Sequence, residues 1–168
     1  MLKKTGIPTQ ADLQEVYPRP ERLAQGPVAV IECFQRIPCN PCATACQRGA
    51  IQPFEDINDR PQLDVDRCNG CALCVASCPG LAIFVVDETY SEDQALIKLP
   101  YEFLPLPQEG KIVAALNRAG EKVGEGIVVR VQNPPAFDRT AVIHLAVPRE
   151  LASDVRNILV EGEPHAER

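Results

Sequence analysis

Cysteine is the residue type that constrains this chain most. All eight cysteines of its 168 residues lie between Cys33 and Cys78. The second half of this stretch reads CNGCALCVASCP and contains four of them: Cys68, Cys71, Cys74 and Cys78. This C-x2-C-x2-C-x3-C-P spacing is typical of [4Fe-4S] clusters, because three thiolates can curl around one cubane while the proline directs the fourth away. Gly70 and the small Ala72 would let the backbone approach such a cluster.

The cysteine pattern occurs twice. Cys46 begins CQRGAI and Cys78 begins CPGLAI, and each follows cysteines four and seven residues earlier. In a pseudo-twofold module of this kind, each half supplies three ligands to one cluster and its last cysteine to the other. The predicted ligands of the first cluster are Cys33, Cys39, Cys42 and Cys78. The predicted ligands of the second cluster are Cys46, Cys68, Cys71 and Cys74.

Cys33 is the irregular member of the first set. A regular motif would place this ligand at position 36, which is Arg36, and a guanidinium cannot replace a thiolate. Cys33 is the one cysteine left, so we predict that it is a displaced ligand and that FQRIP forms a longer loop before Cys39. The alternative is a spare buried thiol beside a [3Fe-4S] cluster.

The residues up to about Val86 resemble the bacterial two-cluster ferredoxins of the 2[4Fe-4S] type. The resemblance rests on the two cysteine groups and implies a ferredoxin-like module with two clusters. The chain departs from the family in the stretched gap before Cys39, in Gln47 where proline is usual, and in an extra segment at each end.

Two other uses of the cysteines remain open. Two zinc sites would also consume eight thiolates, but zinc sites usually pair C-x2-C knuckles a dozen or more residues apart. Disulfides are disfavoured in a reducing compartment. The sequence shows no signal peptide and no run of about 18 apolar residues, which favours a cytoplasmic protein without membrane insertion.

The remaining segments predict an α+β chain in several parts. Residues 1–27 are rich in proline and charge and suggest an extended arm, followed by the ferredoxin-type domain at 28–91. Alternating Val and Ile predict a small β-barrel or docking domain at 92–161, with a hairpin that turns at NRAGE. A short C-terminal helix is expected, with Leu151, Val155, Ile158 and Leu159 on one face, before a tail at 162–168.

No other motif indicates chemistry. The net charge of -6 and the pI near 5.0 argue against a nucleic-acid partner. His144 lies in an alternating pattern and His165 near the end of the chain, so structural or solvent roles are expected for both. No phosphate loop, nucleophile elbow or zinc-protease motif occurs. We therefore expect no catalytic residues and no enzyme activity of the chain alone.

Two clusters in one module predict an electron-transfer protein. The chain resembles the ferredoxin-type subunits of FAD-dependent amino-acid and amine dehydrogenases of the proline or hydroxyproline type, through IECFQRIPCNPC and LPYEFLPLPQEGK. This resemblance implies a hetero-oligomer with FAD-containing subunits and an external electron acceptor or donor. The alternatives are a freely diffusing ferredoxin that serves several enzymes and a cluster-based sensor. A subunit predicts an exposed apolar patch, whereas a free carrier predicts a polar surface.

Overall fold

The computed structural model describes residues 2–160, so His165 and the tail at 162–168 lie outside the described residues. Residues 2–27, which the sequence suggested as extended, contain three short helices: α1 (Leu2–Thr5), α2 (Gln10–Val16) and α3 (Pro20–Leu23). The start of α2 is a capping box, since the Asp12 amide donates to the Thr9 hydroxyl and the Thr9 amide donates to the Asp12 carboxylate. This local signal outweighs the surrounding prolines.

Seven strands form one antiparallel sheet in the order β1-β2-β3-β6-β5-β4-β7. They are β1 (Val28–Ile31), β2 (Ile83–Asp87), β3 (Gln94–Tyr101), β4 (Ile112–Leu116), β5 (Lys122–Gln132), β6 (Ala141–Pro148) and β7 (Asn157–Leu159). The strands β1 and β2 flank the cysteine stretch, and β2 pairs with β3 across the expected boundary at residues 91 and 92. The cysteine-bearing part is thus continuous with the rest of the sheet.

The predicted hairpin is confirmed by the pairing of β4 with β5. Its turn is held by Asn117, whose side-chain oxygen accepts from the amides of Ala119 and Glu121. The glycines of GEKVGEG serve packing in β5, because a Cβ on Gly126 would lie 2.7 Å from Leu145 Cγ. A strand role, together with the turn, accounts for this glycine-rich stretch.

The small β-barrel is not confirmed, because the sheet stays open between its edge strands β1 and β7. The expected C-terminal helix is wrong. In its place lie a 3-10 turn, Arg149–Leu151, and the strand β7, whose Ile158 pairs with Ala115 of β4. The helical spacing of apolar residues was overridden because this segment satisfies the otherwise unpaired edge of β4.

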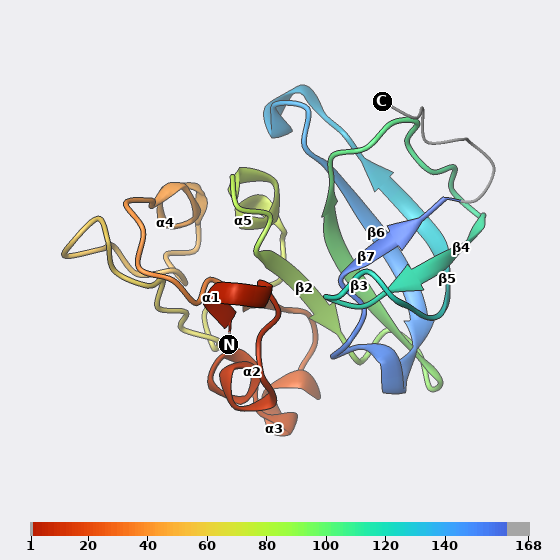
Figure 1. Cartoon of the computed structure of the whole chain (residues 1–168), viewed down its shortest axis with the longest axis horizontal. Helices are drawn as coiled ribbons and strands as arrows, with labels where there is room; N and C mark the ends of the chain where they lie inside the picture. Colours follow the sequence, from red (N-terminus) through yellow and green to blue (C-terminus); the bar gives the residue numbers. More distant parts are fainter. Residues whose placement is uncertain (1, 161–168) are drawn as a thin grey trace.

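The cysteines occupy a lobe at one end of the molecule. Figure 1 shows the helices α4 (Pro41–Ala45) and α5 (Leu73–Ser77) side by side in this lobe, far from β4, β5 and β7. The chain between the two helices forms a projecting loop, tied at its base by the bridge between Ile51 and Leu63. Cys42 and Cys74 belong to an apolar core of this lobe, separate from the core on the other face of the sheet.

Candidate iron-sulfur centres

The two cysteine groups have the same local architecture. Each begins in a loop and ends in a one-turn helix whose C-cap is the last cysteine, Cys46 for α4 and Cys78 for α5. The two C-cap residues have nearly equal backbone angles, φ -78° and ψ 88° for Cys46 and φ -81° and ψ 108° for Cys78. The repeat seen in the sequence is therefore a repeat of conformation.

Backbone amides point at the sulfurs of both C-cap residues. The Ala50 amide donates to Cys46 Sγ at 3.2 Å, and the Ala82 amide, at the equivalent position, donates to Cys78 Sγ at 3.4 Å. The Ala29 amide donates to Cys68 Sγ at 3.4 Å. Hydrogen bonds to a sulfur stabilise negative charge on it, so these amides favour thiolates and raise the potential of any cluster that the thiolates hold.

The loop of the second group contains two residues in the left-handed region, Gly70 with φ 66° and Ala72 with φ 70°. The sequence suggested that Gly70 would make room for a cofactor. The structure adds another reason, because a Cβ on Gly70 would lie 2.5 Å from the Cβ of Pro27. Glycine at this position lets the cysteine loop lie directly against the chain that leads into β1.

The thiols gather into two sets of four. Cys42 interacts electrostatically with Cys33, Cys39 and Cys78. Cys74 interacts in the same way with Cys46, Cys68 and Cys71, and more weakly with Cys42 of the other set. Each set contains three cysteines from one group and the last cysteine of the other. The neighbours of Cys42 and Cys74 are therefore the members of their predicted sets, and the division into two ligand sets stays a prediction.

Burial keeps the innermost thiols protonated in the absence of metal. It raises the pKa of Cys42 to about 11 and that of Cys74 to about 12, and the neighbouring thiols add to both effects. Burial also raises the pKa of Cys33, with smaller contributions from Cys78 and Cys39. Since the thiolate is the metal ligand, metal binding here must release protons and is coupled to pH.

The second set of thiols lines a single cavity between the cysteine loops and the sheet. The other walls are mainly small or apolar, including Ala29, Ile51, Leu63 and Val85. Within residues 2–160, no three His, Cys, Asp or Glu side chains are close enough to hold a single metal ion. The walls offer thiols as ligands and otherwise exclude water, which is the donor set and environment that suit an iron-sulfur cluster.

A buried arginine, which the sequence did not predict, connects the N-terminal helices to the second group. Arg22 of α3 is buried and its guanidinium donates only to backbone carbonyls: Val65 at 2.7 Å, Cys68 at 2.8 Å, Gly26 at 3.0 Å and Pro27 at 3.1 Å. No sequence motif marks this residue, because its partners are main-chain atoms. Arg22 fixes the position from which Cys68 projects.

A second buried network lies next to Cys33. Glu32 accepts from Arg118 at 2.6 Å and from Arg156 at 2.7 Å. Burial raises the pKa of Glu32, but the two guanidinium groups outweigh this effect and leave the pKa below its usual value. Arg156 also lies 5.0 Å above the ring centre of Phe84. These contacts join the end of β1, and hence Cys33, to residues more than 80 positions later in the chain.

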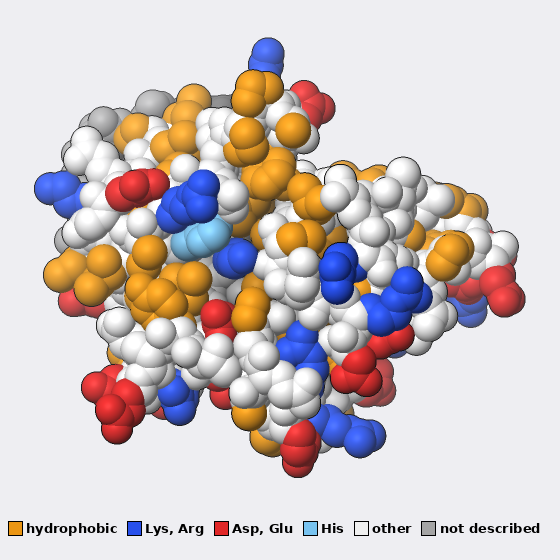
Figure 2. Space-filling model, turned by 180° about the vertical axis from the view of Figure 1, so that it is seen from behind, with side chains coloured by type: hydrophobic (Ala, Val, Ile, Leu, Met, Phe, Trp, Pro, Cys, Tyr) orange, Lys and Arg blue, Asp and Glu red, His pale blue; other side chains and the backbone are white. Residues whose placement is uncertain are grey.

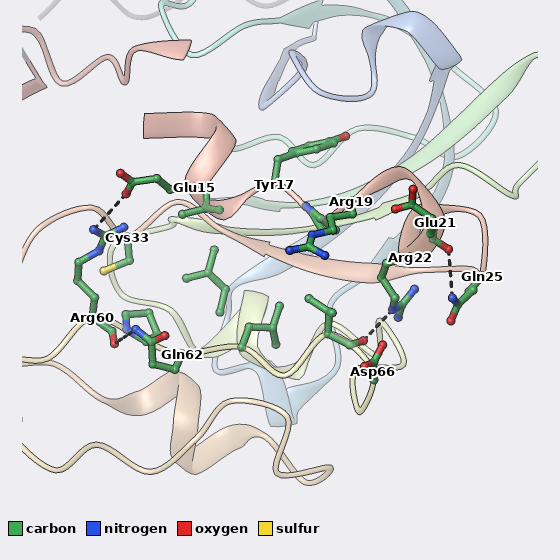
Figure 3. A pocket seen from close by; sticks show the side chains of 16 residues that line it. Glu15, Tyr17, Arg19, Glu21, Arg22, Gln25, Cys33, Arg60, Gln62 and Asp66 are labelled. Atoms are coloured by element: carbon green, nitrogen blue, oxygen red, sulfur yellow. Dashed lines mark hydrogen bonds and ion pairs between the residues drawn. The ribbon is translucent and has the colours of Figure 1, made fainter. Parts of the chain in front are cut away.

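A polar pocket of about 700 Å³ opens beside Cys33. Its walls come from α2, α3 and the segment at residues 60–66, and Figure 3 shows Glu15 and Arg60 facing each other next to Cys33. The Glu15 carboxylate lies 3.6 Å from the Arg60 guanidinium. The N-terminal helices therefore cover the side of the molecule on which Cys33 lies.

His144, for which a structural role was expected, lies in β6 and is buried. Its Nε2 is 2.7 Å from the side-chain oxygen of Gln132 in β5. Burial, together with the charges of Lys98 and Arg130, lowers the pKa of His144 to about 4. The imidazole is therefore neutral near pH 7.

Comparison with known proteins identifies the cysteine-bearing segment. Residues 35–82 match the family model described as 4Fe-4S dicluster domain. This range contains seven of the eight cysteines and leaves Cys33 outside. None of the helices in residues 2–160 has the length and apolar character needed to span a lipid bilayer.

Several known proteins match about a third of the chain. The pyruvate synthase subunit PorD of Methanocaldococcus jannaschii is 42% identical over 52 residues, which cover 31% of this chain and 58% of PorD. The ferredoxin-type protein NapF of Escherichia coli K12 is 40% identical over 52 residues, 30% of this chain and 32% of NapF. The thiosulfate reductase electron transfer subunit PhsB of Salmonella typhi is 41% identical over 51 residues, 27% of this chain and 26% of PhsB.

The chain thus spans less than two thirds of the length of each of these relatives. No solved structure matches it. The family match at residues 35–82 covers the two helices α4 and α5 with their C-cap cysteines and the loop that connects them. The chain therefore contains a 4Fe-4S dicluster domain of the ferredoxin type.

Proposed function

We propose that this protein relays single electrons through two [4Fe-4S] clusters as a non-catalytic subunit of a larger oxidoreductase. The observation that carries the proposal is that the cysteines have as neighbours the members of their predicted sets, and that seven of the eight lie in the segment that matches a dicluster domain. Two of the relatives are named as subunits of redox enzymes, pyruvate synthase and thiosulfate reductase. A [4Fe-4S] cluster, when bound, accepts and releases one electron at a potential set by hydrogen bonds and burial.

The proposed ligands of the first cluster are Cys33, Cys39, Cys42 and Cys78, and those of the second are Cys46, Cys68, Cys71 and Cys74. The chain's own part in the function is to hold these thiolates and to surround them with amide donors. Ala50 and Ala82 supply equivalent amides to the two exchanged cysteines. Apolar walls exclude water from the thiols of the second set.

Exposed apolar side chains support a subunit over a freely diffusing carrier. Leu104 is 87% exposed, Ile112 is 66% exposed and Phe103 is 56% exposed, all within the segment at 92–161 that we propose as the docking region. The segment at 28–91 would then be the cluster-binding region. We further propose that the partner is an FAD-containing dehydrogenase subunit in the cytoplasm, because a flavin handles electron pairs that two single-electron centres can carry away one at a time.

The test is anaerobic purification of the full chain from its native cells, followed by iron counting, EPR spectroscopy and identification of chains that purify with it. About eight irons per chain and a stoichiometric flavoprotein are expected. Zinc without iron would overturn the electron-transfer function. A clean monomer with eight irons would overturn the subunit proposal and favour a soluble carrier.

A pair of variants tests the position of Cys33. The variant Cys39→Ser removes a ligand at a regular position, and the variant Cys33→Ser removes the displaced one. If Cys33 is a ligand, both variants should change the EPR signal of one cluster, and Cys33→Ser should yield about seven irons with a [3Fe-4S] signal. A wild-type iron content and spectrum in Cys33→Ser would remove Cys33 from the ligand set.

A further inference from the structure

The second set of thiols reaches the surface at one residue. Of the eight cysteines, all within the described residues, only Cys71 is exposed. The others are buried or half-buried, and Cys33 lines the pocket between the N-terminal helices and residues 60–66. The rate of electron tunnelling falls steeply with distance. An external redox partner would therefore exchange electrons fastest if it docked next to Cys71.

Basic side chains lie in a row across the sheet beside Cys71. Lys98 of β3 pairs with His144 of β6, which in turn pairs with Arg130 of β5. Residues directly opposite one another in antiparallel strands share a face of the sheet. The Lys98 ammonium donates to the Gly70 carbonyl at 2.7 Å and interacts electrostatically with Cys71. The row therefore runs from an exposed cation on β5 to the cysteine loop.

Two further cations border the cysteine loop. Arg48 is exposed and lines the same cavity as Cys71 and the other thiols of its set. The exposed Arg67 donates to the backbone carbonyl of Arg48 at 3.0 Å. Four cations thus form a basic face: Arg48, Arg67, Lys98 and Arg130.

An exposed apolar row adjoins the basic face. Ile127 of β5 pairs with Ile112 of β4 and with Ala146 of β6, two residues from His144. Strand alternation therefore places Ile112 and Ile127 on the same side of the sheet as the basic row. Both side chains are exposed. Figure 2 shows this side of the molecule, with Lys and Arg side chains flanking a histidine next to apolar side chains.

The basic face stands out because the chain as a whole is acidic, with a net charge of -6. Acidic groups near it are Asp87, which interacts with Lys98, and Glu109, which interacts with His144. Asp64, which accepts from the Arg67 amide, and the exposed Asp66 lie beside Arg67. By contrast, the loop beside Cys39 contains Glu55, Asp56 and Asp59, and the Cys39 amide donates to the Ile57 carbonyl within this loop. This loop also contains Arg60, and Asp59 pairs with Arg36, so acidic side chains there are accompanied by cations.

We propose that the basic face and the adjoining apolar row form the docking surface for a partner protein with an acidic surface and its own redox centre. The inference rests on the proposed function. Charge complementarity would steer the acidic partner to Cys71, and the apolar row would be covered on contact. A cluster held by these thiolates would exchange one electron with the partner's redox centre, in either direction, with no bond formed or broken.

The first test uses small redox ions of opposite charge as probes. The reduced full-length protein is mixed in a stopped-flow instrument with hexacyanoferrate(III) or hexaamminecobalt(III), each of which takes one electron. The double variant Arg48→Glu/Arg130→Glu is compared with Lys4→Glu/Lys122→Glu, which has the same net charge change at exposed sites elsewhere. Iron content and EPR spectra are measured for all three proteins.

At low ionic strength, the basic-face variant should be oxidised about tenfold more slowly by the anion and faster by the cation. The difference should shrink as salt is added, and the control variant should behave like the wild type. Equal rates in both variants, with two intact clusters, would overturn the docking surface and leave the electron-transfer function standing. A wild-type protein without iron would overturn both.

The second test uses tagged copies of the three proteins in native cells. A redox protein with an acidic surface should purify with the wild type and the control variant, elute as salt increases, and be lost from the basic-face variant. Nucleic acid that is lost from the same variant would overturn the proposal in favour of a different partner class. Equal retention of the redox protein by all three would place its docking site elsewhere.

Discussion

The two cysteine groups share a conformation and differ in their surroundings. Both end in a helix C-cap cysteine with an amide donor four residues later. Their helices begin differently, because the N-cap of α4 is Asn40 with φ -142°, whereas the N-cap of α5 is Ala72 in the left-handed region with φ 70°. The two groups are alike at the C-cap cysteine and its amide donor, and they differ at the start of the helix.

The surroundings differ in a way that suits a relay. Cys33 follows Glu32, whose buried ion pairs with Arg118 and Arg156 attach the first group to the β4–β5 turn and to the segment before β7. Cys71 of the second group is exposed beside cations. A symmetric pair of metal sites would offer a partner two equivalent approaches. Here the first group is held by buried ion pairs, whereas the second group has a cysteine exposed to solvent. A partner would therefore meet two different surfaces.

The largest expected effect comes from removing the most buried thiol of each group. We expect Cys74→Ala and Cys42→Ala each to lose a cluster and the fold of the lobe, because metal binding and folding are coupled and both side chains belong to its apolar core. Iron content, visible absorption and circular dichroism would measure the loss. The exposed Cys71→Ser is the comparison and should lose its cluster with less loss of structure. Intact absorption in Cys74→Ala would contradict the ligand sets.

The next effect concerns the anchoring of the first group. Glu32→Gln removes the charge that pairs with two buried guanidinium groups, and we expect the free energy of unfolding to fall by about 3–5 kcal/mol. Anaerobic chemical denaturation near pH 7 would measure it. The exposed pair Arg36 and Asp59 provides the control, since Asp59→Asn should cost about 1 kcal/mol or less. Equal losses in the two variants would mean that Glu32 does not anchor Cys33.

Two glycines test the packing of the second group. Gly70→Ala places a Cβ 2.5 Å from Pro27 in a left-handed backbone, whereas Gly110→Ala has a left-handed backbone and open space around the new Cβ. We expect the strain alone to cost about 1 kcal/mol in Gly110→Ala. The clash should bring the loss to about 2–4 kcal/mol in Gly70→Ala. The melting temperature and the EPR signal of the second cluster would be measured.

If the two variants lost equal stability, the contact between Gly70 and Pro27 would have no energetic role. If Gly70→Ala were stable but had an altered EPR signal, the glycine would act toward the cofactor, as the sequence first suggested. Either result would separate the role of Gly70 in packing from its role in binding.

The sequence predicted the parts of the molecule in which chemistry fixes the spacing. The cysteine repeat predicted which thiols are neighbours of Cys42 and Cys74, because a cluster requires ligands at set intervals. The NRAGE turn predicted the hairpin of β4 and β5. The sequence did not predict the structure of segments whose conformation depends on contacts with residues far away in the chain. The helical spacing around Val155 gave way to pairing of Ile158 with β4, and Arg22 binds carbonyls that no side-chain pattern reveals.

The smallest expected effect is a pH dependence of the region beside the second group. Burial and the charges of Lys98 and Arg130 lower the pKa of His144 from 6.5 to about 4, while Glu109 opposes this shift weakly. Below pH 6.5 the unfolded chain binds a proton that the folded chain does not, so the folded state should lose on the order of 1 kcal/mol between pH 7 and pH 5. The ordinary carboxylates titrate mainly below this range.

The variant His144→Gln should lack this component, so its free energy of unfolding should change less over the same interval, as anaerobic denaturation at each pH would show. Arg130→Gln is the graded comparison, because removing one neighbouring cation should raise the pKa of His144 and shrink the pH effect without abolishing it. The same slope in all three proteins would mean that protonation of His144 does not oppose folding. Lys98 and Arg130 would then not affect the stability of the fold through His144. The neutral state of His144 would follow from its contact with Gln132 rather than from the two neighbouring cations.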